Sequence, residues 1–226
     1  FAPWYTIFTF WPLFPVIGAS GTFITMAVVM APLIGIILGP YLSGLSIAVG
    51  GIIGLSTGQV RGPFDPLSFL PHAATAFCSG MLYNGKRMTC AVTYAFFLVV
   101  FALYPIVGPA WLYPYFIWMQ IVGLVILVSP LQSKALEQIH RYTKSIGLTF
   151  GVGITSFTAA LFGHIVGDIM FEAIYWPNRF SRVEDWKSIW QLLAWVYPIE
   201  RLMIAVTAAF IGTALIKALK AYGLKL

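Results

Sequence analysis

Three ionisable side chains recur at four-residue intervals inside one long apolar stretch of the sequence. They are His164, Asp168 and Glu172, and the stretch around them runs from Ser145 to Trp176. Residues four apart share a face of a helix, and a charged side chain in hydrocarbon is costly unless it faces a bundle interior or a wet cavity. Such a row can contact a ligand, form a structural polar network, bind a metal ion or relay protons. A metal site would need ligands from other segments as well, because one helix supplies too few.

The same stretch carries a second row, made of small residues, that is suited to close helix packing. A transmembrane helix needs roughly 20 apolar residues, and this stretch is longer than that. Small residues spaced four apart let a second helix backbone approach closely in lipid. This spacing predicts helix-packing positions at Gly151, Thr155, Ala159, Gly163 and Gly167. Gly50 and Gly54 have the same spacing and predict another close-packed helix.

The composition is that of a membrane protein. The 226 residues are 60% hydrophobic and 9% charged, with a mean hydropathy of +0.88, whereas soluble domains carry about 25% charged residues. The first charged residue is Arg61. We therefore expect an all-α, polytopic transmembrane bundle of about six to eight spans, forming a single integral membrane domain over residues 1–226.

Proline, glycine and charge divide the chain into segments. Breaks are expected near 30–32 and 39–40, so that the first 58 residues make two long or three short helices. The later segments are apolar helices over 71–83, 88–104 and 115–128, an amphipathic connector over 132–144, a charged loop over 177–187 and a last span over 195–219.

Charge placement predicts how the chain is oriented. Cytoplasmic loops carry an excess of Lys and Arg, so the net charge of +6 reflects membrane orientation and not a nucleic-acid partner. The pattern predicts a multi-pass protein of the cell (plasma) membrane with a cytoplasmic C-terminus. Lipid, other membrane subunits and a small-molecule ligand are then the expected partners.

In this orientation, the ionisable residues of the candidate site fall on the outer side. The Glu200–Arg201 pair follows Pro198 and is expected one turn into the outer end of the last helix. We expect a pocket that opens outward, covered by the loops over 59–69 and 177–190. The candidate substrate-binding residues are His164, Asp168, Glu172, Glu200, Arg201, Trp176 and Arg61.

Motifs for other kinds of chemistry are lacking in the sequence. A haem would need two histidines at similar depth, and the only conceivable pair is His72 and His164, of which His72 lies near a helix start. The sequence contains no Walker motif, H-E-x-x-H, G-x-S-x-G or C-x-x-C, so we expect neither an enzyme nor a bound cofactor. Cys78 and Cys90 are interpreted as packing residues.

Three segments resemble a known family of membrane proteins. The run from Leu33 to Gly54 (L-I-G-I-I-L-G-P-Y-L-S-G-L-S-I-A-V-G-G-I-I-G) resembles the substrate-binding S components of energy-coupling factor (ECF) transporters. The run from Phe69 to Lys86 and the last helix from Trp195 to Gly212 extend the likeness. The matching positions of the first run are Gly39, Pro40, Gly44, Ala48, Gly50 and Gly54.

The resemblance implies a bundle of about six helices that binds a vitamin or a metal ion near its outer face. It also implies docking onto a transmembrane T component that works with two cytoplasmic ATPases. An Ala-x-x-x-Ala docking motif is expected on the first helix, and Ala27 and Ala31 have that spacing.

Two hypotheses of different classes follow. The first is a membrane-embedded subunit that binds or transports a vitamin-like solute. The alternative is a non-catalytic accessory subunit of a larger membrane complex, such as a respiratory or electron-transfer assembly, in which the small-residue faces pack against partner subunits.

Overall fold

Three helices of the chain are long and apolar enough to cross a membrane. The structure is a computed structural model that describes residues 1–15, 23–57, 64, 66–141 and 144–223. The three helices are α2 (Met26–Ser56), α8 (Ser145–Tyr175) and α9 (Val183–Ala221), with mean hydropathies of 1.9, 1.6 and 2.1. Their length and composition indicate a helical membrane protein, as the sequence predicts.

Shorter helices complete the bundle. They are α1 (Ala2–Thr9), α3 (Leu70–Tyr83), α4 (Arg87–Ala102), α5 (Pro109–Leu112), the 3-10 turn η1 (Pro114–Ile117), α6 (Trp118–Val128) and α7 (Pro130–Arg141). The segments Pro114–Val128 and Pro130–Arg141 meet at an angle of 62° and would make a fourth, broken span if they are counted together. Pro130 lies at this bend, where its ring fits the first turn of α7.

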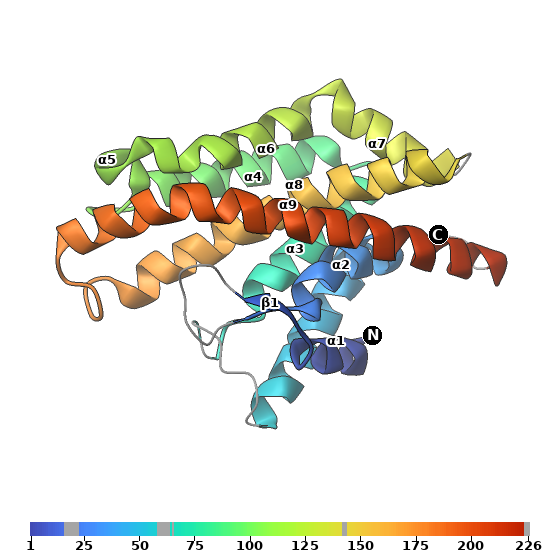
Figure 1. Cartoon of the computed structure of the whole chain (residues 1–226), viewed down its shortest axis with the longest axis horizontal. Helices are drawn as coiled ribbons and strands as arrows, with labels where there is room; N and C mark the ends of the chain where they lie inside the picture. Colours follow the sequence, from blue (N-terminus) through green and yellow to red (C-terminus); the bar gives the residue numbers. More distant parts are fainter. Residues whose placement is uncertain (16–22, 58–63, 65, 142–143, 224–226) are drawn as a thin grey trace.

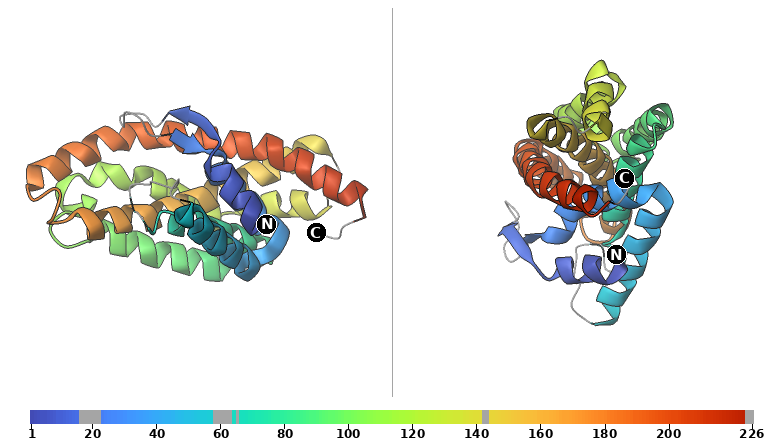
Figure 2. Two further views of the ribbon diagram at one scale, coloured as in Figure 1. Left: turned by 90° about the horizontal axis from the view of Figure 1, so that it is seen from below. Right: turned by 90° about the vertical axis from the view of Figure 1, so that its right-hand side faces the viewer.

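Helices α8 and α9 lie side by side and run in opposite directions (Figure 1). Helices α4 and α6 lie on one side of this pair, and α2 and α3 lie on the other. Helix α3 packs against both α2 and α8. The view along the long axis in Figure 2 shows α1 and the second half of α2 projecting away from the other helices. The predicted site residues on α8 and α9 therefore belong to the part of the bundle that α3, α8 and α9 form together.

The exposed side of the long helices is apolar. On α9 the exposed side chains include Leu202, Val206 and Phe210, and the last of these is 66% exposed. The opposite side of the same helix buries Ile204 and Ala208. A helix that is apolar all round is typical of a protein core or a membrane, so lipid is the solvent that this surface fits.

The small residues of α8 lie where neighbouring backbones come close. A Cβ on Gly163 would overlap Thr75 and the carbonyl oxygen of Pro71, both on α3. A Cβ on Gly151 would overlap the carbonyl oxygen of Ala135 on α7. The row thus contacts α7 at one end and α3 at the other, which is the close approach that small residues allow. Thr155, Ala159 and Gly167 are buried on the same helix.

The N-terminal region differs from the expected two or three helices. After α1, strand β1 (Pro12–Pro15) pairs antiparallel with strand β2 (Phe23–Thr25), and only then does α2 begin. Proline cannot donate a backbone hydrogen bond and disfavours a helix interior, which explains an extended segment between Pro12 and Pro15. Within α2, Gly39 has φ +74° and breaks the helix next to Pro40, as predicted for 39–40, whereas the helix continues through Pro32.

The glycines of α2 beyond this break also face a close neighbour. A Cβ on Gly50 would lie 2.6 Å from the carbonyl oxygen of Ala2 on α1, and Gly54 is buried on the same side, one turn later. Close contact between α1 and α2 therefore takes place at Gly50.

The last helix begins earlier than the sequence predicts. Helix α9 starts at Val183 and includes Pro198 in its interior, so the expected start at residue 195 and the expected loop over 177–187 are wrong in part. Glu184 and Asp185 lie in its first turn, where acidic side chains interact favourably with the helix dipole. The two acidic residues are the sequence signal for the observed start of the helix. The prediction placed the start too late because it took Pro198 to mark the beginning of the helix.

Candidate functional site

The three ionisable residues of α8 are buried together. His164 is 7% exposed, Asp168 4% and Glu172 0%. The Nε2 atom of His164 lies 3.3 Å from Oδ2 of Asp168, one helical turn away, and Glu172 follows one turn later. The spacing in the sequence therefore puts all three on a face that other helices cover.

Helix α9 faces this row with an aromatic ring and a charge pair. The rings of His164 and Tyr197 meet edge to face, with centroids 4.3 Å apart. The guanidinium of Arg201 lies 5.6 Å from the centre of the Tyr197 ring, close enough for a cation–π contact. Oε2 of Glu200, a buried residue, is 3.9 Å from Nη2 of Arg201. The sequence predicts Glu200 and Arg201 for the site, and the structure places both beside α8.

The position of this pair within its helix differs from the prediction. Glu200 and Arg201 lie near the middle of α9, not one turn from an end, because the helix begins at Val183. A role in capping a helix N-terminus is thereby excluded for Glu200. The positive charge of Arg201 is instead close enough to act on His164 and Asp168.

Helices α3 and α1 close the cluster from a third side. Nδ1 of His72 is hydrogen-bonded to the hydroxyl of Tyr5 at 2.5 Å, and Arg201 also acts electrostatically on His72. We refer to His72, His164, Asp168, Glu172, Tyr197, Glu200 and Arg201 as the polar cluster.

Sequence reasoning missed two contributors to this region. Tyr197 lies four residues before Arg201 on the same face of α9, so helical spacing could have pointed to it. Tyr5 has no comparable signal, because its hydrogen bond to His72 depends on how α1 folds back onto the bundle.

Several buried atoms of the polar cluster have no hydrogen-bond partner among the described residues. They are Nε2 of His164, Oδ2 of Asp168, both carboxylate oxygens of Glu172 and Nε of Arg201. The His164–Asp168 contact is a charge-type contact whose geometry does not make a hydrogen bond. Burying a polar group without a partner costs free energy, and native proteins leave few such groups. The cluster is therefore not explained as a self-contained structural network.

A metal site is not formed by the part of the chain that the structure describes. No three His, Cys, Asp or Glu side chains converge there closely enough to hold one ion. Arg201 acts electrostatically on both His72 and His164, and a positive charge near the two histidines is unfavourable for binding a metal cation. The side chains of the cluster are suited to hydrogen bonding and charge pairing.

Two other predicted site residues are not among the members of the polar cluster named above. Arg61 falls outside the described residues, as does much of the 59–69 loop. Trp176 follows the last residue of α8, and its ring contacts Trp186 of α9 edge to face, at 6.5 Å between centroids. Trp176 therefore packs against the aromatic core and does not reach His164 or Arg201.

The described residues line two hollows, and most of the 59–69 loop that is expected to cover an outward-opening pocket lies outside the described residues. A hollow of about 420 Å³ is lined by Tyr113, Tyr115, Trp118 and Trp195. A second, of about 400 Å³, is lined by Ser145, Ile146, Thr149, Phe150 and Phe210. Both are apolar surface grooves without a residue of the cluster, whose own side chains are largely buried in this conformation.

A second buried polar group lies in the first half of α8. The amide of Gln132, on α7, donates from Nε2 to Oγ1 of Thr155 at 3.1 Å. Its Oε1 accepts from the hydroxyl of Thr158 at 3.0 Å. Both ends of the amide are thus used, and this group ties α7 to α8.

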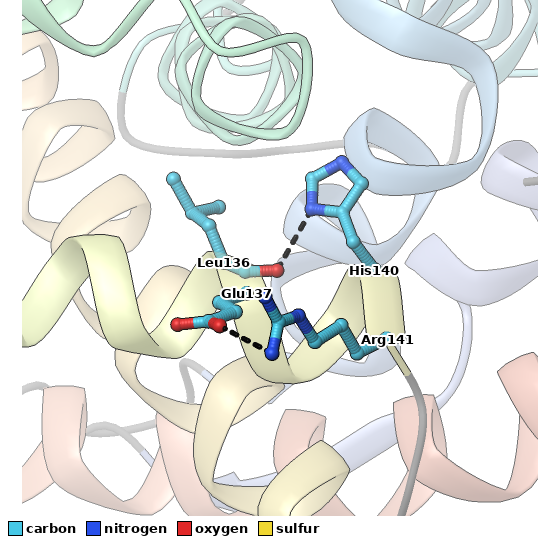
Figure 3. A network of polar contacts seen from close by, with 4 residues as sticks. All are labelled: Leu136, Glu137, His140 and Arg141. Atoms are coloured by element: carbon cyan, nitrogen blue, oxygen red, sulfur yellow. Dashed lines mark hydrogen bonds and ion pairs between the residues drawn. The ribbon is translucent and has the colours of Figure 1, made fainter.

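Two contacts on the exposed side of α7 join residues one turn apart in that helix (Figure 3). Glu137 and Arg141 form an ion pair at 3.0 Å, and Nδ1 of His140 lies 2.8 Å from the carbonyl oxygen of Leu136. The ring of His140 also stacks on Tyr83 of α3, at 4.5 Å between centroids. These contacts fit the amphipathic connector that the sequence predicts.

Comparisons of the chain with protein-family models, with curated proteins and with solved structures find no match. The proposals below therefore depend on the residues and geometry of the chain itself.

Proposed function

We propose that this protein is a membrane-embedded subunit that binds or transports a small organic solute, similar in role to an ECF S component. The carboxylate of Glu172 carries the proposal, because it is fully buried and neither of its oxygens has a hydrogen-bond partner among the described residues. A bound solute would supply the missing partners. The adjoining side chains of Asp168 and Tyr197 extend the same surface, so the solute would contact both α8 and α9.

The proposed solute-binding subunit is not an enzyme. Its side chains bind and orient a molecule, and no nucleophile paired with a base is part of the proposal. By the resemblance of Leu33 to Gly54, its partners would be a transmembrane T component and cytoplasmic ATPases, which supply the energy for release and reorientation.

We further propose a multi-pass arrangement of six to eight spans in the plasma membrane with a cytoplasmic C-terminus. Basic side chains of different helices meet at one end of the bundle, which supports this orientation. Nζ of Lys217 lies 2.6 Å from Oγ of Ser145, joining the end of α9 to the start of α8. Arg87, at the start of α4, donates to the carbonyl oxygen of Ser129 at 3.2 Å.

The short helices α3, α4 and α6 would count as spans in that arrangement, which raises the number above the three long helices. Cysteine labelling from either side of the membrane, at Ser188 and at Tyr222, tests it. Accessibility of both positions from the same side contradicts it.

Binding and uptake test the solute-binding function together. The full chain is purified gently, and native mass spectrometry is used to detect retained small molecules and partner subunits. Uptake is then measured in cells that carry His164→Ala or Asp168→Asn. Glu184→Gln is the control, since Glu184 is exposed in the first turn of α9.

A retained solute, together with uptake that fails in the two cluster variants and persists in the control, supports the proposal. A chain that retains no small molecule, and variants that leave uptake unchanged, would refute it. Stable association with membrane proteins other than ATPases, with no solute present, would favour the accessory-subunit alternative.

A further inference from the structure

Among the described residues, Glu172 has an acidic neighbour but no positively charged one that acts on it. The carboxyl group that acts on it electrostatically is that of Asp168, one helical turn away. Arg201 acts on His72, His164 and Asp168 but has no comparable effect on Glu172. The end of the polar cluster formed by Asp168 and Glu172 therefore holds two neighbouring acidic side chains, and each is costly to bury in its ionised form without a counter-charge.

Arg201 is poorly suited to neutralise Asp168 and Glu172, because it also has Glu200 as an acidic neighbour. Its Nη2 atom lies 3.9 Å from the Glu200 carboxylate, and its guanidinium covers the Tyr197 ring. One guanidinium thus lies beside the Glu200 carboxylate and also acts electrostatically on Asp168. Glu172 remains as a buried acid that lacks a described positive partner.

The unpartnered atoms at this end are mainly acceptors. Oδ2 of Asp168 and both oxygens of Glu172 lack hydrogen-bond partners within the described ranges. A carboxylate accepts hydrogen bonds and donates none. The group that satisfies two carboxylates one turn apart carries several N–H donors and a positive charge, because charge-assisted hydrogen bonds are the strongest.

We infer that the solute bound by this protein is a cationic amine or amidine whose charged nitrogen sits between Asp168 and Glu172. The inference rests on the proposed solute-binding function and names its substrate class. A quaternary ammonium fits less well, because it has no N–H to donate to Glu172. A neutral or anionic solute would leave the two acids without a counter-charge.

Probes of matched shape and different charge test this inference. The probes are benzylamine, benzyl alcohol, benzoate and benzyltrimethylammonium, and the readout is the thermal unfolding temperature of the full chain in detergent as each probe is titrated. A ligand that binds the folded state raises that temperature with its concentration. We expect the dissociation constant of benzylamine to be at least about 10-fold below that of the other three.

Variants locate the binding to these carboxylates. Glu172→Gln keeps the shape and removes the charge, and it should weaken benzylamine binding at least about 10-fold. Asp168→Asn serves if the first variant does not fold. Glu184→Gln, which changes an exposed acid in the same way, should bind as the unsubstituted chain does. The solute released from purified protein is identified by mass spectrometry in parallel.

The outcomes separate this inference from the function on which it rests. Preference for benzylamine that is lost with Glu172→Gln, or a released solute with a basic nitrogen, supports it. A released solute that is neutral or anionic overturns the charge class and leaves the solute-binding function standing. A chain that releases no solute and binds no probe overturns both. Equal binding of benzylamine and benzyl alcohol by the unsubstituted chain overturns the inference even if neither variant folds.

Discussion

Helix α8 carries two buried polar groups, and they differ in how completely they are satisfied. In its first half, Thr155 and Thr158 use both ends of the Gln132 amide. In its second half, Asp168 and Glu172 keep buried oxygens that accept no hydrogen bond from a described residue. Both groups lie on the same apolar helix, so the surrounding medium is similar for the two.

The difference separates a polar group that holds helices together from one that can take a ligand. A buried hydrogen bond contributes about 1 kcal/mol, whereas an unpartnered buried group costs about 1–3 kcal/mol. The Gln132 group therefore stabilises the contact of α7 with α8. The Asp168–Glu172 end instead retains a cost that a bound molecule can relieve.

Gly163 gives the largest expected effect, because both polar groups depend on the close approach of α8 to its neighbours. Gly163→Val places a side chain where Thr75 and the Pro71 backbone lie, and the backbone cannot yield as a flexible side chain can. Overpacking of this kind costs about 1–3 kcal/mol and more against backbone. We expect a loss of most folded protein, measured as monodisperse yield in size-exclusion chromatography.

Gly44→Ala is the matched control for that substitution. A Cβ on Gly44 meets no atom within 4 Å, and alanine is favoured over glycine within a helix by about 0.5–1 kcal/mol. Its yield should equal or exceed that of the unsubstituted chain. A normal yield for Gly163→Val would show that α3 and α8 are not packed as described.

Glu172→Gln gives the next largest effect, and it sharpens the comparison directly. Removing a charge that lacks a described partner should leave the thermal unfolding temperature of the ligand-free protein unchanged or raise it, because the charged form is costly to bury. Solute uptake should fall at least about 10-fold. A lower unfolding temperature with normal uptake would make Glu172 a structural residue like Gln132.

Local features of the sequence predict much of the fold. The apolar run from Ser145 predicts a helix to Trp176, and α8 ends one residue earlier, at Tyr175. The apolar segment over 71–83 predicts α3, which begins one residue earlier. Apolar length, proline and glycine act within a few residues of where they occur, so they can be interpreted without knowing the rest of the structure.

Features that depend on distant contacts could not be predicted in the same way. The pairing of β1 with β2 depends on a contact between two separate segments, and the Tyr5–His72 hydrogen bond joins residues 67 positions apart. The four-residue spacing on α8 predicts a shared face for His164, Asp168 and Glu172. It does not predict that their surroundings leave oxygens unpartnered, because that depends on which atoms α3 and α9 bring to them.

Gln132→Leu tests the satisfied half of the comparison. Leucine has a similar volume, but it removes both hydrogen bonds and leaves Thr155 without its donor, although Thr158 keeps bonds to the α8 backbone. We expect a loss of about 1–3 kcal/mol in the free energy of unfolding, seen as a lower unfolding temperature. Binding of solute should be unchanged, and a variant that loses binding as Glu172→Gln does would remove the distinction between the two halves.

Glu137→Gln gives the smallest expected effect and calibrates the other substitutions. Glu137 and Arg141 form an ion pair on the exposed side of α7, with side chains that are 46% and 73% exposed. Exposed pairs of this kind contribute about 0–1 kcal/mol and are weakened by salt. The unfolding temperature should change by no more than about 4 °C at physiological ionic strength, since a shift of 1 kcal/mol corresponds to about 2–4 °C in a chain of this size. A larger shift in unfolding temperature would mean that an exposed polar contact of α7 stabilises the bundle as much as a buried one does. Hydrogen bonding in the interior would then not be what distinguishes the two halves of α8.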